Sequence, residues 1–121
     1  MLGTADEGGA WVDLVVDPEV GPGRMGIGAI HHVAWRAPGK DDELAQRESL
    51  GAHGYTVTPV RDRNYFESIY FNEPGGVVFE IATDAPGFTV DETEAELGRQ
   101  LRLPPWLEPR RERIEARLPA F

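Results

Sequence analysis

A glutamate inside an apolar run constrains this chain more than any other feature. Residues 77–82 read VVFEIA, and Glu80 is the only charged residue of the run. Such a run predicts a β-strand, in which successive side chains point to opposite faces of a sheet. Because an unpaired buried carboxylate is very costly, Glu80 needs a cation or a metal ion on its face of the sheet.

A histidine pair supplies a candidate partner for this carboxylate. His31 and His32 lie within IGAIHHVAWR, residues 27–36, which predict another strand. Two imidazoles and one carboxylate form an open non-heme iron site, and His32 and Glu80 would be two of those three ligands. His32 is preferred over His31 because it shares a face with Ala34. An exchange of the two histidines, a structural salt bridge and a core histidine remain alternatives.

The remaining pattern predicts the element order βαβββ followed by a tail. A helix is expected over about 42–52, capped by Asp41 or Asp42, and strands are expected over 55–60, 66–73 and 77–84. The tail is expected to hold helices near 91–102 and 108–117, separated by Pro104 and Pro105. The chain thus divides into a linker-like segment (1–26), a βαβββ module (27–90) and a helical tail (91–121).

Strand parity sorts the side chains into two faces. The large apolar face, expected under the helix, holds Val33, Trp35, Ile69, Phe71, Phe79 and Ile81. The opposite face holds His32, Ala34, Ser68, Tyr70, Glu80 and Ala82. One sheet with one helix buries little surface, so a second sheet is expected to cover the polar face. A solvated face is the simpler alternative.

Composition excludes several classes of function. The formal net charge is −9, which disfavours binding to nucleic acid. The chain has no cysteine, so any metal site must use His, Asp or Glu, and a reducing cytoplasm is compatible with the sequence. No apolar stretch approaches the roughly 18–20 residues needed to span a membrane, and the N-terminus lacks a signal pattern. A cytoplasmic protein without membrane or nucleic-acid partners is expected.

The strand order, HHVAW and the segment DRNYFESIYFNEPGGVVFEIATDAPGF (62–88) together resemble a known family. They are similar to the C-terminal module of extradiol ring-cleaving dioxygenases in the glyoxalase/bleomycin-resistance/dioxygenase group, the vicinal oxygen chelate superfamily. The resemblance is strongest to the hydroquinone branch and covers about residues 10–118. It implies an α+β fold: a single βαβββ glyoxalase-like module, half of a barrel, with a helical C-terminal tail.

The resemblance also implies a metal site. In that family two such modules surround Fe(II), which is held by two His and one Glu. His32 matches the His and Glu80 the carboxylate of the second module, while His31, Arg63 and Tyr70 match catalytic positions that border the substrate. This chain has no counterpart of the first module, so the third ligand is expected from an N-terminal-type partner module or from a second copy in a homodimer.

The expected activity is therefore Fe(II)-dependent cleavage of a hydroquinone- or catechol-type aromatic substrate by dioxygen. A homodimer would instead gather two His and two Glu, which suits a glyoxalase-type isomerase or epimerase with Zn(II) or Ni(II); Mn(II) is a further alternative metal. A metal-free module that binds a small molecule is the third possibility. Ordinary packing of Tyr70 and a solvated Arg63 are the corresponding non-functional interpretations.

Overall fold

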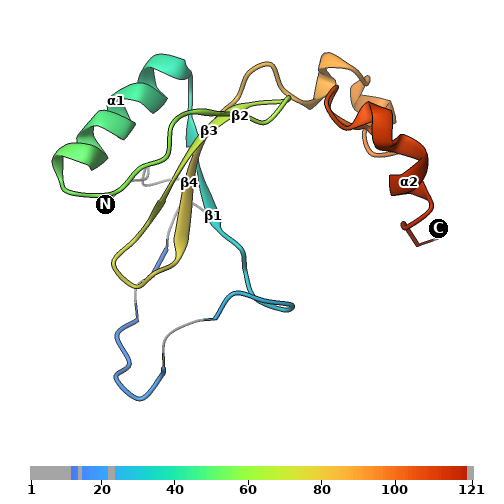
Figure 1. The fold of residues 1–121 in the computed structure, drawn as a ribbon. Helices are drawn as coiled ribbons and strands as arrows, with labels where there is room; N and C mark the ends of the chain where they lie inside the picture. Colours follow the sequence, from blue (N-terminus) through green and yellow to red (C-terminus); the bar gives the residue numbers. More distant parts are fainter. Residues whose placement is uncertain (1–11, 14, 22–23, 120–121) are drawn as a thin grey trace.

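The computed structural model describes residues 12–13, 15–21 and 24–119. Strands β1 (Val33–Ala37), β2 (Arg61–Asp62), β3 (Glu67–Asn72) and β4 (Val78–Thr83) form one sheet, and helix α1 (Lys40–Ala52) lies between β1 and β2 in the chain (Figure 1). The predicted α+β fold and the βαβββ order are confirmed. No helix within the described residues has the length and apolar character required to cross a membrane.

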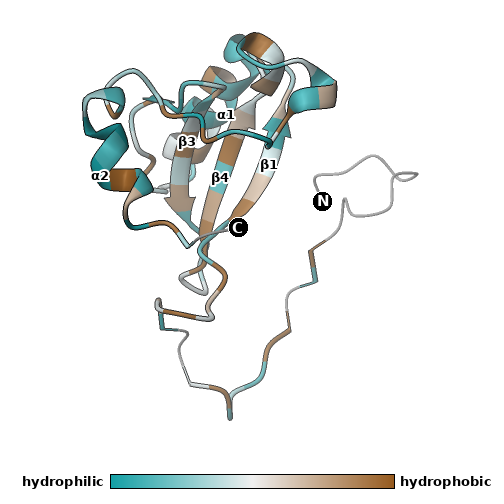
Figure 2. Ribbon diagram, turned by 90° about the vertical axis from the view of Figure 1, so that its right-hand side faces the viewer, coloured by the Kyte–Doolittle hydropathy of each residue, from teal (hydrophilic) through white to brown (hydrophobic). Residues whose placement is uncertain are grey.

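The sheet places β4 at its centre. The strand order is β1-β4-β3-β2, with β1 parallel to β4 and the other two pairs antiparallel. Glu80 on β4 therefore stands opposite Ala34 on one side and Tyr70 on the other. In Figure 2 the strands lie in front of α1, so that the face away from the helix is turned to the viewer.

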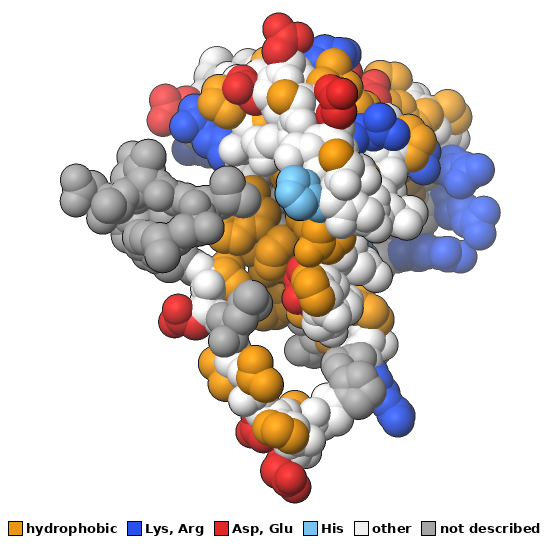
Figure 3. Space-filling view, turned by 90° about the vertical axis from the view of Figure 1, so that its left-hand side faces the viewer, with side chains coloured by type: hydrophobic (Ala, Val, Ile, Leu, Met, Phe, Trp, Pro, Cys, Tyr) orange, Lys and Arg blue, Asp and Glu red, His pale blue; other side chains and the backbone are white. Residues whose placement is uncertain are grey.

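The core lies between α1 and the apolar face that strand parity predicts. Ala37, Ile69 and Ile81 are buried, and the partly buried residues packed against them are Trp35, Leu50, Val57, Val60 and Phe71. Helix α1 leaves part of this face open, since Val77 is 45% exposed. Hydrophobic side chains are visible in the middle of the helix side of the molecule, below a charged upper part (Figure 3).

Two predicted strands differ from the structure. The strand expected over 27–36 begins only at Val33, because a turn in which the Ala29 N–H donates to the Gly26 carbonyl precedes it and Gly28 has a φ of 88°. The strand expected over 55–60 is absent, and the short strand β2 lies after it, between the segments expected as strands over 55–60 and 66–73. The Thr58 N–H donates to the Tyr70 carbonyl (2.9 Å), but the Arg47 side chain takes the Thr58 carbonyl (2.9 Å). The Tyr70 N–H therefore donates to the Thr58 hydroxyl, and no regular ladder forms.

The predicted cap of α1 is also wrong. Gly39 occupies the cap position with extended backbone, and no side chain caps the helix. Asp41 and Asp42 instead lie in the first turn, where negative charge interacts favourably with the helix dipole.

The tail is less helical than predicted. Between residues 91 and 102 only the 3₁₀ turn η2 (Glu94–Glu96) forms, because Leu97 is extended and Gly98 has a φ of 77°. A second 3₁₀ turn, η1 (Phe88–Val90), precedes it. The helix expected near 108–117 is present in part, as η3 (Glu108–Arg110) followed by α2 (Arg111–Glu115).

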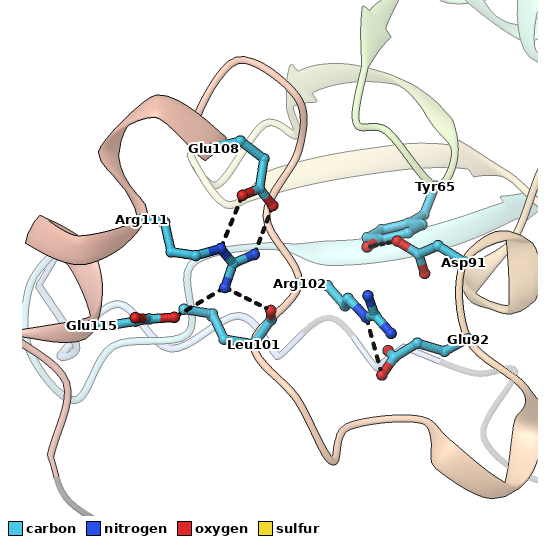
Figure 4. A network of polar contacts seen from close by, with 8 residues as sticks. All are labelled: Tyr65, Asp91, Glu92, Leu101, Arg102, Glu108, Arg111 and Glu115. Carbon is cyan, nitrogen blue, oxygen red and sulfur yellow. Dashed lines mark hydrogen bonds and ion pairs between the residues drawn. The ribbon is translucent and has the colours of Figure 1, made fainter.

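Arginine contacts hold the tail together. Arg111 donates to Glu108, Glu115 and the Leu101 carbonyl, and Arg102 pairs with Glu92 at 3.3 Å (Figure 4). The tail connects back to the sheet end through the Tyr65 hydroxyl, which donates to Asp91 at 2.9 Å.

Candidate metal centre

His32 and Glu80 form the centre of the candidate site. His32 precedes β1 directly and Glu80 lies in the middle of β4, so the parallel pairing of the two strands brings the side chains together. His32 Nε2 lies 2.8 Å from Glu80 Oε2, and Glu80 is only 3% exposed. The predicted proximity of these side chains is confirmed, whereas their role as metal ligands stays a prediction.

The second oxygen of Glu80 is held by Tyr70. The Tyr70 hydroxyl donates to Glu80 Oε1 at 2.6 Å from the adjacent strand β3. Arg63 Nε donates to the same hydroxyl at 3.1 Å, and the Arg63 guanidinium lies 5.1 Å from the centre of the Tyr70 ring. Tyr70 thus contacts the carboxylate and Arg63 contacts the Tyr70 phenol, whereas the place of both residues beside a substrate stays a prediction.

His31 contacts the far side of the His32 ring. The two Nδ1 atoms lie 2.8 Å apart, so one of them carries a proton and the other accepts it. When His32 presents its Nε2 lone pair to a metal ion, its proton must sit on Nδ1 and is donated to His31. A metal-bound histidine usually has such a partner, which fixes its tautomer and the orientation of its ring.

The donor set suits part of a metal centre. Two ligands at about 2.0–2.2 Å from one ion lie roughly 3.0–3.4 Å apart, so His32 and Glu80 need to separate by only a few tenths of an ångström. Among the described residues no group of three or more His, Cys, Asp or Glu could hold a metal ion. Within that part of the chain, the structure therefore offers one imidazole and one carboxylate.

Sequence reasoning missed two residues around the site and the core. Ser68 was placed on the polar face without a role, although its hydroxyl lies 3.0 Å from the Tyr70 hydroxyl. Glu43 on α1 is fully buried, and both of its carboxyl oxygens lack a hydrogen-bond partner in the described part of the chain. Burial raises the pKa of Glu43, the charge of Glu67 raises it further, and Lys40 opposes the shift.

Comparison with known proteins identifies the family. Residues 1–81 match the Glyoxalase/Bleomycin resistance protein/Dioxygenase superfamily. The chain is 50% identical over 118 residues to a Bacillus subtilis (strain 168) protein named ring-cleaving dioxygenase MhqO, covering 98% of this chain and 38% of that protein. It is 38% identical over 100 residues to chlorohydroquinone/hydroquinone 1,2-dioxygenase from Sphingobium indicum strain UT26, covering 80% of this chain and 31% of the relative.

A solved structure agrees with these relatives. A crystal structure from Bacillus subtilis, titled as that of a dioxygenase, superposes with a TM-score of 0.79 at 53% identity, covering 84% of this chain and 33% of that one. The chain therefore spans between about a third and two fifths of the length of the proteins it matches. The family match and these identities show that this chain belongs to the Glyoxalase/Bleomycin resistance protein/Dioxygenase superfamily.

Proposed function

We propose that this chain supplies His32 and Glu80 to the metal centre of an extradiol-type ring-cleaving dioxygenase that acts on a hydroquinone- or catechol-type substrate. The observation that carries the proposal is the 2.8 Å approach of His32 Nε2 to a nearly buried carboxylate oxygen. Relatives named as ring-cleaving and hydroquinone dioxygenases support the reaction class.

Fe(II) is the proposed metal, with Mn(II), Zn(II) and Ni(II) as alternatives. Two His and one carboxylate leave open positions on a ferrous ion, which then supplies the redox chemistry that couples dioxygen to ring cleavage. The described residues bring one of the two imidazoles, so the other comes from a partner: an N-terminal-type module or a second copy of this chain. The greater length of the relatives is consistent with a further module.

The surrounding residues would control protons and charge. The Tyr70 hydroxyl donates a hydrogen bond to Glu80, and this supports a role for Tyr70 as an acid–base group in the reaction. Arg63 carries a permanent positive charge next to that hydroxyl and favours a negatively charged substrate oxygen. His31 keeps the His32 ring in the orientation that metal binding needs.

The proposal is tested by anaerobic Fe(II) titration followed by oxygen uptake with hydroquinone, for the chain alone and for the chain mixed with a candidate N-terminal-type module. We expect metal binding to be lost in His32→Ala and kept in His53→Ala, because His53 is exposed at the end of α1, where its ring hydrogen-bonds the Ser49 carbonyl. Oxygen uptake is expected on mixing.

Other outcomes would favour the alternatives. A dimer of this chain that binds Zn(II) or Ni(II) and consumes no oxygen would point to isomerase or epimerase chemistry. A chain that binds no metal with or without the partner would contradict the proposal and favour a metal-free binding module.

A further inference from the structure

Ser68 lies beneath the Tyr70 phenol on the face of the sheet opposite α1. It is fully buried (0% exposed) and precedes Tyr70 by two residues on β3, so both side chains point to the same face. Its hydroxyl oxygen lies 3.0 Å from the Tyr70 hydroxyl oxygen. This buried hydroxyl is therefore connected to the Glu80 carboxylate through the Tyr70 hydroxyl.

The direction of this hydrogen bond is fixed by its neighbours. The phenol oxygen has one proton to donate and two lone pairs to accept with. An ionised Glu80 can only accept, so at 2.6 Å it takes the phenol proton. Arg63 Nε can only donate and uses one lone pair of the phenol. Ser68 must therefore donate into the remaining lone pair.

Burial distinguishes the two donors to the phenol. Arg63 is exposed and lies in the loop after β2, whereas Ser68 belongs to a strand whose register is set by β4. Ser68 stands opposite Ala82, and Tyr70 stands opposite Glu80, so the ladder fixes the position of Ser68 relative to the carboxylate. The interior donor is thus the more rigid of the two.

We propose that Ser68 is a positioning residue for the metal centre. By donating to the Tyr70 hydroxyl, Ser68 directs the phenol proton to Glu80 Oε1 and leaves Oε2 facing His32. This inference rests on the proposed function, because it takes Glu80 and His32 as the ligands. It adds a residue that acts through Tyr70 and does not itself reach the metal or the substrate.

A double-mutant cycle tests the inference on the 121-residue chain with Co(II) as the probe. Calorimetric titration of Ser68→Ala should show Co(II) affinity about tenfold weaker than wild type, as is usual when support of a ligand is lost. In the Tyr70→Phe background the same substitution should cause no further loss, because Ser68 acts only through the phenol.

Thr83→Val is the matched control. Thr83 is also a buried hydroxyl residue of the sheet, but its hydroxyl accepts from the Glu67 N–H on the α1 side. Its removal should leave Co(II) affinity unchanged. Should Ser68→Ala melt below the assay temperature, Ser68→Cys keeps a similar volume with a much weaker donor and replaces it in the cycle.

The possible results separate this inference from the proposed function. Wild-type affinity in Ser68→Ala, or an equal loss with and without the Tyr70 hydroxyl, would overturn the role of Ser68 while leaving the metal centre in place. A wild-type chain that binds no Co(II), either alone or mixed with the candidate N-terminal-type module, would overturn the metal centre itself and, with it, any role of Ser68 at that centre.

Discussion

Within the part of the chain that the structure describes, two glutamates are buried, and these residues, Glu80 and Glu43, lie on opposite sides of the same sheet. Glu80 faces away from α1, and each of its oxygens has a partner, His32 for one and Tyr70 for the other. Glu43 lies on α1 at the sheet side and has no hydrogen-bond partner for either oxygen among the described residues. The same side chain is therefore held in two opposite electrostatic environments.

The difference shows that burial of a carboxylate does not by itself mark a functional site. Each oxygen of Glu80 has a side-chain partner, and a carboxylate held in this way is a suitable ligand for a metal ion. Around Glu43 burial favours the protonated form and raises the pKa of the carboxyl, with Glu67 acting in the same direction. We expect a functional role for a buried carboxylate whose oxygens have partners. We expect a free-energy cost of folding for a buried carboxylate whose oxygens have none.

Replacing each of the two glutamates by glutamine tests whether Glu80 binds a metal ion while Glu43 does not. Glu80→Gln keeps the size of the side chain but removes the negative charge from the proposed first coordination sphere. We expect its Co(II) affinity to fall by more than about a hundredfold, since loss of a ligand exceeds the usual loss for a supporting group. Glu43→Gln should bind Co(II) as wild type does. Unchanged Co(II) stoichiometry and affinity in Glu80→Gln would remove Glu80 from the ligand set.

Glu43→Gln should instead change stability. A carboxyl group whose pKa is raised in the folded protein favours folding at low pH, and this contribution is lost as the pH rises from the unfolded-state pKa towards the folded-state value. Above that range the wild-type chain must either bury a charge or keep Glu43 protonated at a free-energy cost. The amide avoids this cost, so the variant should be more stable by about 1–2 kcal/mol at pH 8.

Urea unfolding at pH 8 and at pH 4 measures this difference. The gain should be large at pH 8 and small at pH 4, which lies below the ordinary pKa of 4.5, so that Glu43 is mostly protonated in the unfolded state and more fully protonated in the folded state. Glu48→Gln is the matched control, because Glu48 is exposed on the same helix. A variant that is less stable than wild type at both pH values would show that Glu43 has a favourable partner.

The contrast between the two glutamates also shows what the sequence could predict. The approach of His32 to Glu80 follows from strand parity together with the resemblance to the family. The burial of Glu43 does not, because the apolar neighbour Leu44 would be placed inside by hydrophobicity and is 42% exposed. Leu50 packs on the core and lies seven residues after Glu43, hence on the same helix face, so its docking carries Glu43 inside.

Side-chain contacts that the local sequence pattern does not encode account for two further differences, the missing strand at 55–60 and the contact of Ser68 with Tyr70. The residues 55–60 alternate as a strand should, but Arg47 on α1 captures the Thr58 carbonyl and prevents regular pairing with β3. Nothing in the local pattern encodes that contact. The role of Ser68 escaped for a similar reason, since parity placed it correctly while only the three-dimensional arrangement shows which hydroxyl its proton reaches.

The smallest expected effect concerns His31. Its measurement decides which of the two histidines, His31 or His32, binds the metal ion together with Glu80. His31 contacts the Nδ1 atom of His32 but is exposed, so water can replace it as the acceptor of the His32 proton. His31→Ala should therefore weaken Co(II) binding by only about threefold, whereas His32→Ala should abolish it. His53 is an exposed histidine at the end of α1, and His53→Ala should have no effect on Co(II) binding.

If calorimetry shows the reverse order, with His31→Ala losing the metal and His32→Ala retaining it, the two histidines have exchanged roles. Glu80 would then bind the ion beside His31, and its contact with His32 would be a structural salt bridge.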